Sequence, residues 1–247
     1  MTFRGLAEYL QKLDETSLRN KMTEILAELF KHAEEKEIGE ICYLLQGRVA
    51  PLFEAIEFGM ADQMIIRSIS LGLDIKKEEV TAKFKKIGDL GKTTQELKNN
   101  NKKQITNNKK LSVHNVYQVL YKIAVSAGPG SQEEKIKLLA ELIKNLDSLS
   151  CRYVVRIPIN KLRLGFSDMT ILDSLSWFLT GNKSLRPEIE RAYNVRPDLS
   201  FISNTIKEKG VKGLADTKPE VGTPILMARA ERMTSGEDYS TGLEGGM

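Results

Sequence analysis

The sequence of 247 residues contains few of the side chains on which metal and covalent chemistry depend. It has two cysteines, Cys42 and Cys151, which form no CxxC motif, and two histidines, His32 and His114. This scarcity argues against a disulfide framework, a zinc ribbon, a His-rich metal site and most histidine-dependent catalysis. Long apolar runs are also missing. None approaches the roughly 18 residues of a membrane span, and the charged N-terminus has no signal-peptide core.

Motifs for nucleotide or metal chemistry are absent as well. The glycine-containing turn at 126–131 lacks the spacing and the Gly-Lys-Ser/Thr ending of a P-loop. The acidic residues form neither a DxD nor an ExxH pattern. No catalytic residue, metal ligand or cofactor site is therefore predicted in this chain, and a stand-alone enzyme is poorly supported.

The composition indicates a folded chain that is mildly basic. Hydrophobic residues make up 41% and charged residues 28%, with 37 Lys+Arg against 33 Asp+Glu. The hydrophobic fraction is too high for a disordered chain, and the length suits one large helical domain or two small ones. The net charge of +4 allows a nucleic-acid partner but is weak evidence for one.

Apolar residues recur at intervals of three and four along nearly the whole chain, which predicts an all-α fold. We expect a compact bundle of about 10–12 helices, with Asp74 opening one helix and a Ser131–Glu134 capping box opening another. Residues 98–110, rich in Lys and Asn, are expected to form a surface loop. The predicted helices cover 18–30, 36–46, 51–58, 60–71, 74–87, 112–126, 131–146, a segment ending at Pro158, 167–181, 186–193, 198–209 and 223–233.

An internal repeat indicates two similar halves. Residues 58–69 align without a gap with residues 164–175, matching Gly59 with Gly165 and Asp62 with Asp168. A looser match sets residues 85–91 beside 207–213. We therefore expect pseudo-twofold symmetry within one domain of residues 1–222, with halves near 1–110 and 111–222. Residues 223–247 are interpreted as a linker and a frayed tail.

The densest group of cations lies between residues 152 and 163, in a stretch that has no acidic residue from 151 to 167. It ends with Lys161 and Arg163 just before Gly165 and a predicted helix start. Glycine allows a close backbone approach, a helix start offers free N–H groups to an anion, and arginine forks onto phosphate. This arrangement suits DNA phosphates. The alternative is a solvated basic helix face with a glycine that only turns the chain.

Weaker candidates of the same kind stand elsewhere in the chain. Gly88 and Gly91 frame a tight turn followed by Lys92, and Arg48 follows Gly47. Ser131 stands at a predicted helix start that suits a phosphate. A plain helix-ending turn is the alternative at residues 88–91.

In these segments the sequence resembles the N-terminal DNA-binding domain of ATP-dependent DNA ligases. The matching segments are 47–51 (GRVAP), 88–91 (GDLG), 126–131 with the following helix, 152–156 (RYVVR), 161–165 (KLRLG), 170–175 (TILDSL), 192–199 (AYNVRPDL) and 223–228 (TPILMA). Together they cover nearly the whole chain. The resemblance implies an all-helical, pseudo-twofold domain that holds nicked duplex DNA across its minor groove through backbone and phosphate contacts, without sequence preference.

The resemblance also carries expectations about site residues and partners. The expected DNA-binding residues are Arg163, Lys161, Gly165, Arg156, Gly88, Gly91, Lys92, Arg48 and Ser131. The implied partners are nicked DNA, the adenylation and OB-fold domains of the same ligase, and a sliding clamp, with no membrane. ATP and magnesium would serve the full-length enzyme in DNA replication, repair and recombination, in the cytoplasm at the nucleoid.

The chain departs from the family pattern at several positions. The Lys-x-Asp-Gly motif of the adenylation domain is absent, because no Asp here is followed by Gly. Asn160 stands where the family often has glycine, and Pro158 interrupts the preceding helix. We expect a ligase segment that ends before the catalytic domain and is inactive alone. The alternative is a helical protein-interaction scaffold with incidental basic patches.

Overall fold

Helices account for nearly all regular structure in the computed structural model, which describes residues 1–101, 110–162 and 164–226. Within these residues there is no β-sheet, so the all-α prediction is confirmed. The helices are α1 (Phe3–Asp14), α2 (Arg19–His32), α3 (Glu37–Leu45), η1 (Leu52–Glu54), α4 (Asp62–Leu73), α5 (Lys77–Ile87), α6 (Leu90–Asn100), α7 (Val113–Val125), α8 (Ser131–Asn145), α9 (Ser148–Arg156), α10 (Asp168–Thr180), α11 (Arg186–Val195), α12 (Leu199–Lys209) and η3 (Val211–Leu214).

Several helix ends follow the predicted capping residues. Ser112 caps α7 and forms a reciprocal capping box with Asn115. Ser167 precedes α10, and Gly181 ends that helix in the left-handed conformation. The helix predicted to stop at Pro158 ends at Arg156. Ile157 keeps helical dihedral angles, but Pro158 has no N–H to continue the hydrogen-bond ladder of the helix.

Two predicted helix starts are wrong. Gly130, with φ +83°, precedes α8 in place of Ser131, and Glu134 accepts a hydrogen bond from Ser126, so the predicted capping box does not form. Asp74 ends α4 with φ +54° and does not open α5, because Asp tolerates the left-handed conformation that a helix end requires.

Several segments differ from the predicted boundaries, and neither α1 nor α6 was among the predicted helices. Only Leu52–Glu54 within 51–58 is helical, as one short 3₁₀ turn. α6 extends to Asn100, into the predicted loop, of which residues 102–109 lie outside the described residues. Residues 223–226 are not helical, and the rest of the helix predicted there also lies outside the described residues.

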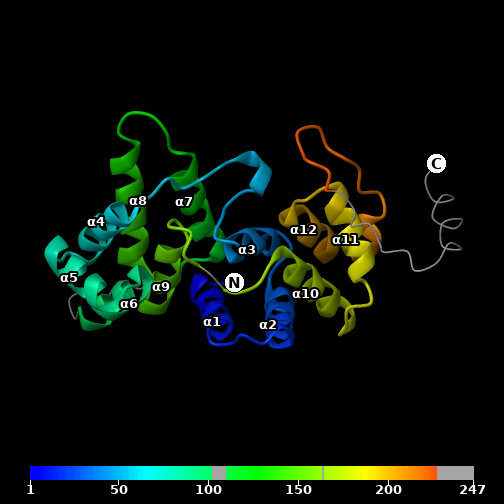
Figure 1. The fold of residues 1–247 in the computed structure, drawn as a ribbon, viewed down its shortest axis with the longest axis horizontal. Coiled ribbons are helices and arrows are strands. Elements are labelled where there is room, and N and C mark those ends of the chain that lie inside the picture. The colour runs from blue at the N-terminus through cyan, green and yellow to red at the C-terminus, as the bar shows by residue number, and fades with distance from the viewer. Residues whose placement is uncertain (102–109, 163, 227–247) are drawn as a thin grey trace, which may run out of the picture.

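The helices pack across the two halves of the sequence (Figure 1). In one lobe α4 packs on α8 and α6 packs on α9, whereas in the other α10 packs on α2 and α12 packs on α3. α1 contacts α2 and α9, and α7 contacts α8 and α3, so these two helices join the lobes. Each lobe therefore combines helices from an early and a late part of the chain, around one continuous apolar core.

Backbone hydrogen bonds join the starts of α1 and α7. Thr2 and Ser112, the two N-cap residues, form an antiparallel bridge. The Phe3 N–H donates to the Leu111 carbonyl at 2.9 Å, and the Val113 N–H donates to the Met1 carbonyl at 3.1 Å. This mutual pairing is the contact expected near a local twofold axis.

The looser sequence match, residues 85–91 with 207–213, stays a prediction. A likeness between the halves appears at Lys98 and Lys207, because each lysine caps a helix of the opposite half of the sequence. Lys98 Nζ donates to the carbonyl of Ile143 at the end of α8, at 2.5 Å. Lys207 Nζ donates to the carbonyl of Phe30 near the end of α2, at 2.9 Å. A lysine satisfies carbonyl groups that have no partner within their helix.

Candidate nucleic-acid interface

Two equivalent turns follow α3 and α9. After α3, Gly47 adopts φ +71° and the Arg48 N–H donates to the Tyr43 carbonyl at 3.1 Å. After α9, Asn160 adopts φ +52° and the Lys161 N–H donates to the Arg156 carbonyl at 3.0 Å. Both are Schellman-type helix ends, which need a left-handed residue, usually Gly and sometimes Asn. Asn160 therefore performs the conformational role of a glycine, and Arg48 and Lys161 hold matching positions.

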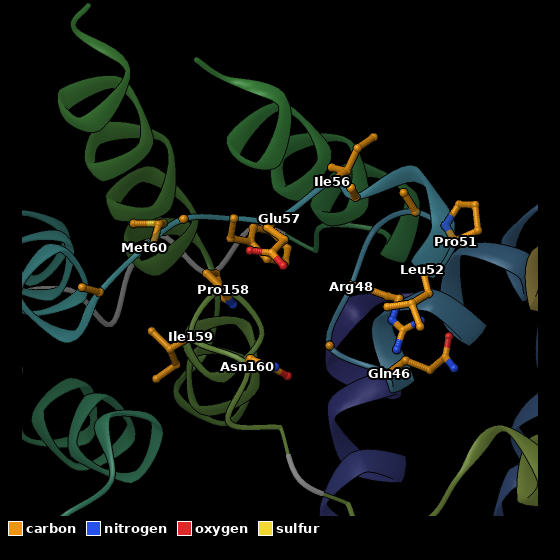
Figure 2. A pocket seen from close by; sticks show the side chains of 16 residues that line it. Gln46, Arg48, Pro51, Leu52, Ile56, Glu57, Met60, Pro158, Ile159 and Asn160 are labelled. Carbon is orange, nitrogen blue, oxygen red and sulfur yellow. The ribbon is translucent and has the colours of Figure 1, made fainter. Parts of the chain in front are cut away.

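The two turns face each other across a groove. A side chain beginning at Gly47 would lie 3.7 Å from Oδ1 of Asn160. Figure 2 shows Gln46 and Arg48 on one side of a hollow of about 510 Å³, with Pro158, Ile159 and Asn160 opposite. A second hollow of about 290 Å³ lies beside it, and Gln46 and Asn160 line both. The turns thus form the centre of one continuous concave surface.

The helices of the internal repeat begin beside these turns. Gly59 (φ +58°) precedes α4 and Gly165 (φ +79°) precedes α10. Lys161 Nζ donates to both carboxylate oxygens of Asp62, the first residue of α4, at 3.1 and 3.2 Å. Asp168, the first residue of α10, accepts from Gln46 and from the Tyr193 hydroxyl. Each turn therefore contacts the start of a helix in the opposite half of the sequence: the first turn contacts α10, and the second contacts α4.

The two turn cations differ in their pairing. Lys161 is held by Asp62, whereas the ion pairs among the described residues include none for the partly exposed Arg48. The groove is not uniformly positive, because the exposed Glu57 also lines it.

Arg156 is a structural residue, which corrects its prediction as a DNA contact. It is only 6% exposed, and its guanidinium donates to Asp89 at 2.9 Å and to Asp14 at 3.1 Å. Burial alone would lower the pKa of Arg156, but the hydrogen bonds to these carboxylates raise it above the ordinary value. A buried cation with two carboxylate partners is not available to phosphate. It joins α9 to the end of α1 and the start of α6.

Gly91 also has a packing role in place of the predicted DNA contact. A Cβ at this position would lie 2.4 Å from the carbonyl oxygen of Arg152 in α9. Gly91 therefore lets α6 and α9 cross closely. Gly88 ends α5 with φ +76° and is exposed, with no atom near its missing side chain.

Exposed lysines surround the start of α6. Lys85 and Lys86 in the last turn of α5 and Lys92 in α6 are exposed, and no ion pair recorded for the described residues involves them. Asp89 accepts from the Lys92 N–H at 2.6 Å and from Arg156, which places this helix start next to the end of α9. These lysines extend the basic surface from the second turn.

Ser131 and Arg163 add no observed contact. Ser131 is the first residue of α8, but Glu133 and Glu134 in the same turn oppose an anion there. Arg163 lies outside the described residues. Neither the ion pair of Asp62 with Lys161 nor the left-handed turn at Asn160 was predicted from the sequence. The available signal for the turn was that Asn160 stands where the family often has glycine.

The described residues offer no metal site and no membrane-spanning helix. The described part of the chain contains no cluster of three or more His, Cys, Asp or Glu side chains suited to a metal ion. Among the helices of residues 1–101, 110–162 and 164–226, none is long and apolar enough to cross a membrane. The groove between the two turns is therefore the leading candidate site.

The fold and this surface define an all-α domain with a groove between two similar turns, each of which carries a cation. The family described as DNA ligase N terminus matches residues 2–176, and the chain belongs to that family. It is 42% identical over 238 residues to a probable DNA ligase of Dictyoglomus thermophilum, covering 96% of this chain and 40% of that protein. It is 40% identical over 242 residues to a DNA ligase of Sulfurisphaera tokodaii, covering 95% and 40%. The chain thus spans about two-fifths of the length of these relatives.

Proposed function

We propose that this domain binds nicked duplex DNA without sequence preference, as the DNA-binding domain of an ATP-dependent DNA ligase. The observation that carries the proposal is the pair of equivalent turns, Gly47–Arg48 and Asn160–Lys161, around one groove. The two strands of a duplex are antiparallel, so phosphates on either side of a minor groove are related by local twofold axes. A protein surface with matching symmetry offers each strand a similar turn and cation.

The contacts in this proposal are mainly to the DNA backbone. A ligase must act at any sequence, so phosphate contacts and groove shape serve it better than base readout. Arg48 and Lys161 would hold phosphates, with Lys85, Lys86 and Lys92 extending the contact along one strand. Gly165 is exposed and left-handed, which leaves its backbone open to close approach. Arg163 remains a predicted contact from the resemblance.

Fluorescence anisotropy with a labelled nicked duplex tests the binding. The logarithm of the affinity should fall linearly and steeply with the logarithm of the salt concentration, because bound phosphates release counterions. Duplexes of unrelated sequence should bind alike. An affinity that stayed flat from low to moderate salt would contradict the phosphate grip.

Charge reversal locates the interface. Arg48→Glu should weaken binding by far more than Lys77→Glu. Lys77 is exposed and begins α5, at one end of the molecule in Figure 1, and glutamate is favourable in the first turn of a helix. Equal effects of the two variants would remove Arg48 from the interface, and equal melting temperatures would exclude unfolding as the cause.

ATP and magnesium belong, in this proposal, to the adenylation and OB-fold domains of a full-length ligase that seals nicks in replication, repair and recombination. The residues present here do not fit the nucleotide, since no Asp in the chain is followed by Gly and the adenylated lysine motif is missing. Incubation with α-labelled ATP should leave this chain unlabelled, and a covalent adduct would overturn the assignment. A sliding-clamp partner and a cytoplasmic, nucleoid-associated location are part of the same proposal.

One observation favours the alternative, a protein-interaction scaffold. A hollow of about 370 Å³ is lined mostly by apolar side chains of η1, α10, α12 and residues 224–226, among them the 75%-exposed Leu52. An interaction module would offer such a surface and would not retain DNA. The anisotropy measurement at low salt separates the two, because retention of nicked duplex is expected only from the ligase domain.

A further inference from the structure

The two turn cations face different surroundings, although they hold equivalent positions. Lys161 Nζ lies 3.1 and 3.2 Å from the carboxylate oxygens of Asp62. The equivalent carboxylate on the other flank, Asp168, accepts instead from the uncharged side chains of Gln46 and Tyr193. Lys161 is thus neutralised by its facing carboxylate, whereas Arg48 is not.

The ion pair of Lys161 is suited to being exchanged. Its two side chains are 43% and 41% exposed, so water screens the attraction and little free energy holds the pair together. Asp62 also stands at the first position of α4, where the helix dipole favours a negative charge. Asp62 would therefore stay in place when Lys161 turns toward another anion.

We propose that Asp62 competes with a DNA phosphate for Lys161 and thereby sets a weaker grip on this flank than on the Arg48 flank. The inference rests on the proposed DNA-binding function. A phosphate reaching Lys161 must replace a carboxylate that remains nearby, whereas a phosphate reaching Arg48 breaks no ion pair recorded among the described residues. The Arg48 flank would therefore contribute more to the affinity than the Lys161 flank.

The test uses an isosteric change with a matched control. Asp62→Asn removes the competing charge, and Asp74→Asn makes the same change in net charge at the far end of the same helix. Asp74 is exposed, and Asn tolerates its left-handed conformation. With a nicked duplex at low salt, Asp62→Asn should tighten binding by about two- to fivefold, the factor that corresponds to one exposed ion pair. Asp74→Asn should leave the affinity unchanged.

A second background separates competition from plain repulsion. If Asp62 acts by occupying Lys161, then Asp62→Asn should have no effect in a chain that already carries Lys161→Gln. An equal gain in both backgrounds would mean that Asp62 simply repels the DNA, and the proposal would be overturned. Asp62→Ser, compared by thermal unfolding and by the same titration, replaces Asp62→Asn if that variant does not fold.

The remaining outcomes are distinguishable from a failure of the proposed function. Suppose that the unchanged chain binds DNA and that Arg48→Glu weakens this binding. If Asp62→Asn then leaves the affinity unchanged, the competition is refuted while the DNA-binding function stands. If the unchanged chain does not retain nicked duplex at low salt, the proposed function fails and this inference fails with it.

Discussion

Replacing Gly91 by alanine tests whether the start of α6 is a helix crossing or a DNA contact. The new Cβ would lie 2.4 Å from the Arg152 carbonyl oxygen and 2.9 Å from Cγ and Nε of Arg156. A backbone carbonyl has no rotamer to adopt, so α6 and α9 must separate. Overpacking of this kind costs about 3 kcal/mol at the upper end of its usual range. Alanine recovers about 1 kcal/mol through its helix propensity, which leaves a net loss of about 2 kcal/mol.

Thermal unfolding followed by circular dichroism measures this loss. For a domain of this size, a loss of about 2 kcal/mol lowers the melting temperature by roughly 4–8 °C. Gly5→Ala in α1 is the matched control, because its Cβ would meet its nearest neighbour, Thr2 Oγ1, at an ordinary 3.5 Å. That variant should gain stability, by up to about 1 kcal/mol. A Gly91→Ala chain that melted like the unchanged chain but lost affinity for nicked DNA would refute the packing role.

Two further predictions concern the half-buried Asp89 and the buried Lys98. Burial opposes the charge of Asp89, but hydrogen bonds from the Lys92 N–H and from Arg156 lower the pKa of this carboxyl below its ordinary value. The stability that Asp89 contributes is therefore present above the unfolded-state pKa and is lost as the pH falls through the folded-state pKa. Urea denaturation across acidic pH should show this loss, and Asp89→Asn should flatten it; identical slopes would contradict the linkage. Lys98→Met should lower stability by about 1–2 kcal/mol, because the Ile143 carbonyl loses a charged donor. Lys92→Met, exposed on the same helix, should change little, and equal urea midpoints for the two variants would disprove the capping role.

Local sequence signals were sufficient for most of the fold. A period of 3.6 residues identifies amphipathic helices without knowledge of their partners, and capping by Ser112 depends only on the residues that follow it. Periodicity failed at 51–58, where apolar residues line a loop over the groove and only three residues are helical. The helix-start signal failed at Asp74, because aspartate suits both the start and the left-handed end of a helix.

The site was only partly predictable, because burial and ion pairing depend on distant parts of the chain. Arg156 resembles a phosphate ligand in sequence, but its partners Asp14 and Asp89 stand 142 and 67 residues away. The pairing of Lys161 with Asp62 spans 99 residues. No local pattern reveals such contacts. The Gly47–Arg48 turn was easier to predict, since a glycine followed by a cation is a short-range signal, whereas Asn160 gave no such signal.

The packing of early helices against late ones within each lobe has a consequence for synthesis of the chain. As the ribosome releases α2 and α3, their packing partners α10 and α12 have not yet been made. The apolar faces of these early helices therefore wait, exposed to solvent or to chaperones, until nearly the whole domain has emerged. Folding of this kind relies on long-range contacts and is slow. A cut near residue 110 would leave two pieces that can build either lobe only by assembling with each other.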